Sequence, residues 1–357
     1  MLKGNKGEWS EVYAFCYLLS KGILTAADKD LNPTVMFFPI LNILREEIRG
    51  TVLKYCPVTP NWNSVKIYKD NTLLKTVEKE DMDAIVSHLL DVIPNGERAF
   101  EIPEVNAFFD SIYVHKLKAD SAHKQDIDIH IHDIRTGYDP VCGFSIKSYL
   151  GSKPTLVNPG KGTNFVYVVE KCSEEIAAQT NSIDTRTKIK DRLRNLKDSG
   201  CSILCTETMQ SAQFKENLEF VDSRMPEIIS NVLLIAYRNG IKKLSDAVNV
   251  LKEENPLGFS NSNMYEYKMK KLLCACALGM TPEHAWEGAE DANGGYIVVK
   301  KDGSVVCYHI YNRTDFEQYL YDYTCFDTPS TSRYEYMSVY EEDGVYKLKL
   351  NLQIRFV

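Results

Sequence analysis

The chain has 357 residues, of which 44% are hydrophobic and 25% charged, so one large or two ordinary globular domains fit its length and intrinsic disorder is excluded as its main state. No apolar run of about 18 residues occurs and residues 1–10 are polar, so neither a transmembrane helix nor a secretion signal is expected. The 42 Lys and Arg against 49 Asp and Glu give a net charge of −7, which argues against a protein coated by polyanions but allows a nuclease with a local basic groove.

The first predicted element is a helix over residues 10–19. Ser10 can cap it, apolar residues recur at helical spacing, and Gly22 can end it. Further elements predicted before residue 100 are a helix over 38–55 ended by Pro57, a strand over 65–68, a helix over 79–90 and a turn at 94–96.

Residues 126–133 read DIDIHIHD, a strict alternation that predicts a strand with Asp126, Asp128, His130 and His132 on one face. A turn follows at 136–140, and a second strand is predicted over 141–149 with Ser145 and Lys147 on its polar face. The two histidines fit exposed strand positions better than a catalytic base.

The rest of the chain is first helical and then β. The predicted elements are a strand over 164–169, helices over 184–197 and over 214–279 with a break near 256, and hairpins at 302–303 and 343–344, whose strands span 296–299 with 305–310 and 334–340 with 346–354. This order indicates an α+β fold with an α/β core, divided into residues 1–200 and a helical, β-rich lobe over 201–357, or built as one unit.

The ten cysteines are scattered. Neither Cys201 with Cys205 nor Cys274 with Cys276 forms a CxxC pair, and no histidine follows at zinc spacing. We therefore expect reduced thiols in a cytoplasmic protein, with a metal site formed from distant residues as the alternative.

The predicted hairpin brings carboxylates and a lysine together, which suits Mg²⁺-dependent hydrolysis of phosphodiesters. The alternative is a solvated face with ordinary charges. Ser145 stands where such nucleases usually carry an acid, so either it binds the metal through water or a second carboxylate comes from elsewhere. The candidates are Asp128 on the same strand and Glu8 or Glu11 on the first helix.

Several long segments resemble the HpaII family of type II restriction endonucleases. They are Gly4–Glu11, Gly143–Phe165, Gly294–Arg313, Thr328–Arg333 and Lys349–Phe356. The resemblance implies a PD-(D/E)xK nuclease fold, with a mixed central sheet flanked by helices, and a Mg²⁺ cofactor. It also implies cleavage of double-stranded DNA at a short palindromic site, and it suggests CCGG.

The resemblance also assigns roles at the hairpin. Asp126, in the sequence KQDI, resembles the metal-binding aspartate, and Lys147 resembles the catalytic lysine, with Asp128 as the alternative metal ligand. Ser145 departs from the general pattern. We expect Glu11, more than Glu8, to complete the metal site.

Candidate DNA contacts lie in three places. The loop with Ser152 and Lys153 follows the catalytic lysine, and the basic segment 181–200, with Lys188 and Arg192, could meet phosphates or be a solvated helix with ion pairs. Arg313 and Arg333, expected in loops, could read guanine.

The resemblance is compatible with a homodimer on DNA, involves no membrane, and implies a methyltransferase that protects the same site without having to bind the enzyme. Two other functions remain open: a DNA-binding protein whose nuclease site has decayed at Ser145, and a repair-type nuclease on the same core. Cleavage of phage DNA into discrete bands, its absence, or a smear distinguishes the three.

Overall fold

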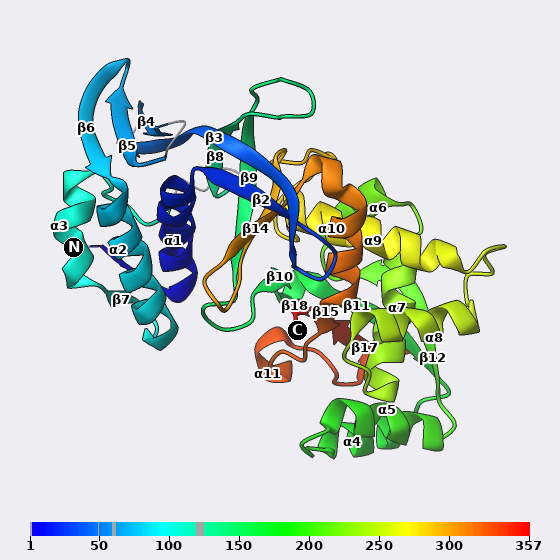
Figure 1. Ribbon diagram of the computed structural model, residues 1–357. Helices are drawn as coiled ribbons and strands as arrows, with labels where there is room; N and C mark the ends of the chain where they lie inside the picture. The colour runs from blue at the N-terminus through cyan, green and yellow to red at the C-terminus, as the bar shows by residue number, and fades with distance from the viewer. Residues whose placement is uncertain (1, 49, 59–61, 119–124) are drawn as a thin grey trace. The chain divides into compact units, whose positions relative to one another are not determined.

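The computed structural model describes residues 2–48, 50–58, 62–118 and 125–357, and its contacts divide the chain into two compact units (Figure 1). Unit 1 comprises residues 1–154, 277–279 and 290–319, and unit 2 comprises 155–276, 280–289 and 320–357. The first segment of unit 1 thus ends at Pro154. The predicted boundary between residues 200 and 201 concerns the nuclease core and the DNA-recognition lobe, and it stays a prediction.

Unit 1 is built on a nine-stranded mixed sheet. Its strands are, in sheet order, β2 (Ile23–Ala27), β14 (Val305–His309), β13 (Gly295–Val299), β9 (Val141–Ser148), β8 (Ile127–Ile131), β3 (Pro33–Ile48), β4 (Thr51–Pro57), β5 (Ser64–Lys69) and β6 (Thr72–Glu78). β13 pairs parallel with β9 and β14 pairs parallel with β2, and the other neighbours are antiparallel, which confirms a mixed α+β architecture.

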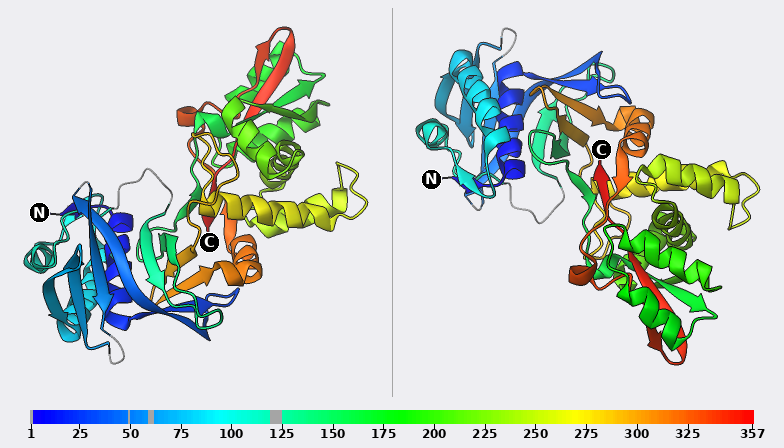
Figure 2. Two further views of the ribbon diagram at one scale, coloured as in Figure 1. Left: turned by 90° about the horizontal axis from the view of Figure 1, so that it is seen from above. Right: turned by 90° about the horizontal axis from the view of Figure 1, so that it is seen from below.

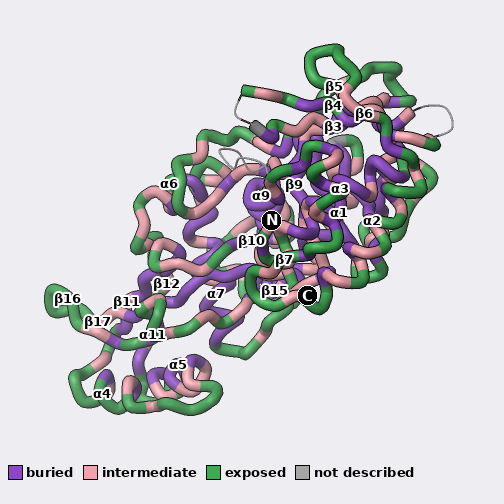
Figure 3. The backbone as a smooth tube through the Cα atoms, turned by 90° about the vertical axis from the view of Figure 1, so that its left-hand side faces the viewer, coloured by how far each residue is buried: buried purple, intermediate pink, exposed green. Residues whose placement is uncertain are grey.

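Helix α1 (Lys6–Lys21) forms the core of unit 1 against the sheet, in contact with β3, β9 and β14 (Figure 1). Trp9, Val12 and Phe15 are fully or almost fully buried in it, and Figure 3 shows this helix among buried segments. Helix α2 (Lys79–Val92) packs beside it, and α3 (Pro103–Ser111) and the short strands β1 (Lys3–Gly4) and β7 (Phe100–Glu101) complete this side.

The ends of α1 are fixed by its own sequence. Asn5 is the N-cap, and its side chain accepts from the backbone N–H groups of Gly7 and Glu8 while the Glu8 carboxylate accepts from the Asn5 N–H. The prediction of Ser10 as the cap was wrong, because its hydroxyl donates to the Lys6 carbonyl inside the helix. The predicted stop at Gly22 is confirmed, since this residue is left-handed with φ 67°.

The predicted helix over 38–55 was also wrong, because these residues form β3 and β4. Phe38, Ile40 and Ile43 are buried, and the register of β3 against β8 shifts between Ile40 and Asn42. This irregularity places apolar residues three apart, a spacing that imitates a helix.

Unit 2 surrounds the buried helix α7 (Met225–Asn239), which packs on β12 and on helices α5, α6 and α8. Its four-stranded antiparallel sheet has the order β12 (Ser202–Met209), β11 (Asn164–Glu170), β17 (Val345–Asn351) and β16 (Tyr340–Glu342). Figure 2 shows the red hairpin of β16 and β17 alongside the green strands. A three-stranded sheet has the order β10 (Thr155–Val157), β18 (Ile354–Phe356) and β15 (Thr324–Phe326).

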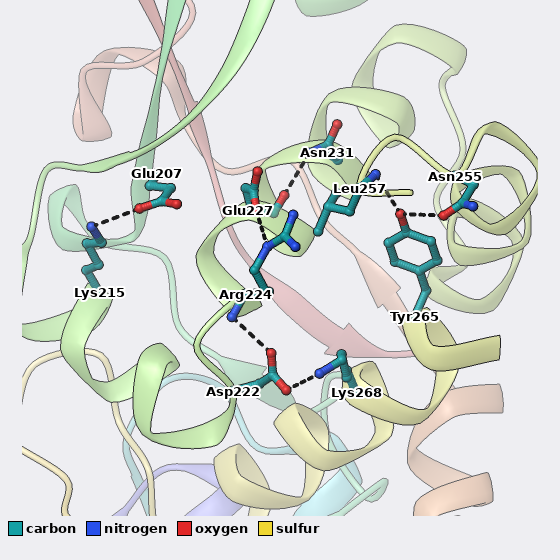
Figure 4. A network of polar contacts seen from close by, with 10 residues as sticks. All are labelled: Glu207, Lys215, Asp222, Arg224, Glu227, Asn231, Asn255, Leu257, Tyr265 and Lys268. Atoms are coloured by element: carbon teal, nitrogen blue, oxygen red, sulfur yellow. Dashed lines mark hydrogen bonds and ion pairs between the residues drawn. The ribbon is translucent and has the colours of Figure 1, made fainter. Parts of the chain in front are cut away.

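The remaining helices are α4 (Glu174–Ser182), α5 (Lys188–Asp198), α6 (Ala212–Val221), α8 (Leu244–Glu254), α9 (Asn263–Leu278), α10 (Arg313–Asp322) and α11 (Thr331–Tyr334). A polar network ties α6, α7 and α9 together, with Asp222 accepting from the Arg224 N–H and pairing with Lys268 (Figure 4). No described helix is long and apolar enough to cross a membrane.

Most of the other predicted elements are confirmed. They are the strands at 65–68 and 164–169, the helix at 79–90, the helical region 214–279 with its break at 256, and the hairpin at 302–303. The helix predicted from 184 begins only at Lys188. The hairpin at 343–344 is confirmed by β16 and β17, but its first strand begins only at Tyr340, and α11 ends at Tyr334 before it. All ten cysteines are free thiols, as expected.

Candidate active site

Asp126 lies directly before β8, where the antiparallel pairing with β9 brings it beside Ser145. The Asp126 N–H donates to the Phe144 carbonyl at 2.8 Å, which extends the ladder by one residue. Its Oδ2 accepts from the Ile146 N–H at 2.7 Å and from the Ser145 hydroxyl at 3.2 Å. The predicted hairpin is therefore confirmed, and two hydrogen bonds fix the orientation of this carboxylate.

Ser145 is fully buried, with none of its surface exposed. Its hydroxyl is directed to Asp126, so its contact in the structure is with the neighbouring carboxylate. This geometry favours an orienting role over the alternative in which Ser145 binds a metal through water.

Glu11 reaches this site from α1. Burial, as the largest cause, and the charge of Asp126 together raise the pKa of its carboxyl to about 8, although Lys118 and Lys147 act in the opposite direction. The side chain as a whole is partly exposed, but its Oε2 is buried and has no hydrogen-bond partner among the described residues. Glu8, in contrast, is used by the capping box of α1.

A cavity of about 190 Å³ opens between these carboxylates. Glu11, Asp126 and Asp128 all line it, so the three acidic residues expected at the metal site share one space. Lys147, three residues beyond Phe144 on β9, lies close enough to act on the charge of Glu11. Within the described residues, no group of three or more His, Cys, Asp and Glu side chains has the arrangement of a metal centre.

The two strand histidines have local partners. His130 contacts the Asn42 side chain at 3.0 Å through Nδ1 and the Asp139 carbonyl at 2.8 Å through Nε2. His132 Nδ1 lies 2.7 Å from the Asp139 carboxylate. Both rings therefore hold the loop between β8 and β9, and their non-catalytic role stays a prediction.

The sequence did not reveal a buried ion pair beside the cavity. Arg45 pairs with Glu47 and donates to the Lys116 carbonyl, and Glu47 accepts from the backbone N–H groups of His115 at 2.7 Å and Lys116 at 3.2 Å. This clamp holds the segment that carries Lys116, which lines the cavity, and Lys118, which lowers the pKa of Glu11. The i, i+2 spacing of Arg45 and Glu47 is a strand signal that the predicted helix obscured.

The expected DNA-contacting residues of unit 1 have different surroundings. Ser152 and Lys153 are exposed in the loop after β9. Arg313 begins α10 and does not lie in a loop, and its guanidinium contacts both carboxylate oxygens of Glu290, at 2.9 and 3.1 Å. Base reading by Arg313 would require this bidentate pair to break.

In unit 2 the expectation for Arg192 was wrong. The residue is buried, and its guanidinium donates to the carbonyls of Asn181 at 2.7 Å, Met337 at 2.9 Å and Ile183 at 3.0 Å, so it holds α4, α5 and a distant loop together. Lys188 is partly exposed and pairs with Asp184 at 3.1 Å. Arg333 is exposed in the single turn of α11.

Comparisons with known proteins agree on one family. The family model of the HpaII restriction endonuclease matches residues 5–356. The chain is 38% identical to the type II restriction enzyme HpaII of Haemophilus parainfluenzae, over 99% of this chain and 98% of that enzyme. No solved structure matches.

Proposed function

Because the chain belongs to the HpaII restriction endonuclease family and is thereby a type II site-specific deoxyribonuclease, we propose that it cleaves double-stranded DNA at CCGG with Mg²⁺ held at the Glu11–Asp126 cavity. The resemblance supplies CCGG. The geometry of the cavity supports the metal site, and the single observation that carries it is the buried, unpartnered Oε2 of Glu11 beside a second carboxylate.

We propose that the core of unit 1 is a PD-(D/E)xK fold. Its support is the order of elements: α1, the antiparallel strands β3, β8 and β9, and then β13, which pairs parallel with β9. Asp126 before β8 and Lys147 on β9 support this proposal as the acid and the lysine of the pattern, and Ser145 departs from it. The sheet carries further strands on both sides of this core.

The donor set fits Mg²⁺. Two carboxylates lining a small cavity are enough for this ion, which keeps waters and takes phosphate oxygens as its other ligands. A cation also relieves the mutual repulsion of Glu11 and Asp126 that is visible in the raised pKa of Glu11. When bound, Mg²⁺ polarises the scissile phosphate and lowers the pKa of its water.

The residues of the chain then have separate tasks. Ser145 and the Ile146 N–H hold Oδ2 of Asp126, which orients the carboxylate toward the cavity. Glu11 supplies the second carboxylate, with Asp128 as the alternative. Lys147 stabilises the charge that develops on the phosphate or orients the attacking water.

Contacts with the DNA backbone are proposed for Ser152 and Lys153 beside the active site and for Lys188 in unit 2, and a base contact for Arg333, all of which are at least partly exposed. Arg192 is left out because its donors are used inside the protein. A palindromic site has two-fold symmetry, so we propose one copy of the chain for each half-site. A methyltransferase of the same specificity would protect the host DNA.

The test is incubation of the purified protein with phage DNA and Mg²⁺. Discrete bands whose ends map to CCGG support the proposal. Binding without cleavage would instead indicate a degenerate site, and a smear would indicate a nuclease of repair type. Repeating the digestion on DNA methylated at CCGG checks specificity, since methylation should abolish the bands.

A further inference from the structure

A cavity of about 580 Å³ in unit 2 lies between α5, the turn after α7 and the segment Thr328–Ser332, which is most of the TPSTSR motif. Its volume is in the range of pockets that bind small ligands. Four basic side chains line this α5 cavity, Arg186, Lys188, Lys190 and Lys242, and no acidic residue is among its described lining. In a chain of net charge −7, this concentration of positive charge selects for an anion.

Two of these four cations, Arg186 and Lys242, have no counterion among the described residues. Arg186 and Lys242 are exposed and form no ion pair with any residue in the described part of the chain. Some other cations of unit 2 are neutralised: Figure 4 shows Lys215 paired with Glu207 and Lys268 paired with Asp222. The acids closest in sequence to the α5 cavity are themselves engaged. Asp184 pairs with Lys188 and Asp327 with Arg355, and Asp191 pairs with Arg194 and accepts from the hydroxyls of Thr185 and Thr187.

The lining residues other than the four basic ones indicate which class of anion fits the cavity, namely a nucleotide. The hydroxyls of Ser330, Thr331 and Ser332 stand on the side of the cavity formed by the TPSTSR motif, where they can donate to phosphate oxygens. Ile189, Tyr237 and Phe326 are buried side chains that give the cavity an apolar floor, which suits a sugar or a base. The cations and hydroxyls at the rim of the cavity thus suit a phosphate group, and its apolar floor suits the nucleoside joined to that phosphate.

We propose that the α5 cavity binds a phosphate-bearing nucleotide unit, held by Arg186 and Lys242. The source favoured by the structure is a strand of duplex DNA, a choice that rests on the proposed function. Lys190 also borders a second cavity of about 660 Å³, which Arg194 and Lys197 line as well. Its one acidic lining residue among those described, Glu254, is paired with Arg238, so the basic surface continues past a single nucleotide along α5. A free nucleotide has the same chemistry and is the other source.

The experiment uses the full chain and three glutamine variants, Arg186→Gln, Lys242→Gln and Lys243→Gln. Lys243 is the matched control, because it is the neighbour of Lys242 and equally exposed but does not line the α5 cavity. Fluorescence anisotropy of a labelled duplex is measured in EDTA between 50 and 200 mM salt, so binding is read without cleavage. The result is thereby independent of the proposed active site.

At about 0.1 M salt, each cavity variant should weaken duplex binding roughly five- to tenfold and reduce the slope of log affinity against log salt by about one. Lys243→Gln should change affinity less than about twofold. A second arm follows the melting temperature with deoxyadenosine monophosphate or pyrophosphate. The free nucleotide is identified as the source if the probe raises the melting temperature of the wild type but not of the cavity variants, while the cavity variants keep the duplex affinity of the wild type. If the cavity variants match Lys243→Gln in both arms, the proposal is wrong.

Discussion

Replacing Glu11 by glutamine should stabilise the metal-free protein at alkaline pH while it impairs Mg²⁺-dependent cleavage. The folded protein raises the pKa of this carboxyl from 4.5 to about 8, chiefly through burial. The folded state therefore retains a proton that the unfolded state loses, so stability is fully present below pH 4.5 and falls as pH rises toward 8. Glutamine removes this titration.

The size of the effect follows from the same pKa. Each pKa unit corresponds to about 1.4 kcal/mol, so an upper bound for the loss is about 5 kcal/mol. Glu11 is partly exposed, and water that reaches the carboxylate reduces the penalty, so about 2–4 kcal/mol is expected. For a chain whose total stability is of order 10 kcal/mol, such a change is readily measured.

The assay is urea denaturation in EDTA at pH 5 and pH 8.5. The free energy of unfolding of wild type should fall between these values by about 2–4 kcal/mol more than that of Glu11→Gln. Glu8→Gln is the control, since glutamine preserves the capping box and leaves the buried carboxyl of Glu11 in place. Parallel pH dependences for wild type and Glu11→Gln, within about 0.5 kcal/mol, would refute the buried, protonated Glu11.

Three further predictions concern the catalytic strand pair and the aromatic core. Lys147→Ala should keep folding and duplex binding but lower the single-turnover cleavage rate by orders of magnitude, and a loss below about tenfold, or 1.4 kcal/mol of barrier, would place the site elsewhere. Asp126→Asn should impair cleavage more than Asp128→Asn, measured on the same DNA, and the reverse ranking would move the metal ligand along β8. His309 is buried, and neither ring nitrogen forms a hydrogen bond with a residue that the structure describes; its pKa falls to about 4 because burial disfavours the charged ring. The stability that the neutral ring contributes is therefore fully present above pH 6.5, and about 3 kcal/mol of it is lost as the pH falls to 4. In urea denaturation, the free energy of unfolding of His309→Phe should change less between pH 6.5 and pH 4 than that of the wild type. An equal change in both proteins would contradict this.

The hairpin of β8 and β9 could be predicted from the sequence because its signals are local. The alternation of residues 126–133 and the turn chemistry after it determine which side chains share a face, and the observed pairing of Ile127 with Phe144 agrees. Local patterns do not show which other strands pair with this hairpin. β13 joins β9 from 150 residues farther along the chain, and no local pattern encodes that distance.

The error at residues 38–55 has a specific physical origin. A regular strand would place buried residues two apart, but the irregularity near Ile40 shifts the next buried side chain to Ile43. Pairing with β4 and β8 then overrides the helical spacing, since β3 gains a partner on each side. The same error concealed the clamp of Arg45 and Glu47.

Arg192 shows a limit that applies to basic residues in general. Composition predicts a phosphate contact for a lysine- and arginine-rich helix, but the role of one guanidinium depends on whether acceptors surround it in the fold. For Arg192 one acceptor is the Met337 carbonyl, 145 residues away. Arg186, six residues earlier and just before α5, has no such acceptor among the described residues, and this difference separates a structural arginine from a candidate ligand-binding one.

Ser145 and Glu11 are linked in the proposed site, because Ser145 stands where the general nuclease pattern has an acid and Glu11 supplies an acid from α1. In the proposed site the second acid is absent from β9 and is supplied by α1, so the number of carboxylates available to the metal is preserved. A third carboxylate at position 145, fully buried beside Asp126 and near Glu11, would add repulsion to a site where burial and the charge of Asp126 already lift the pKa of Glu11 to about 8. A serine at this position removes that repulsion and donates a hydrogen bond to Asp126. The consequence is that the proposed metal site depends on the placement of α1, which the Asn5 cap and the buried Trp9 fix. Changes at either residue should therefore weaken cleavage through Glu11 without touching the reacting atoms.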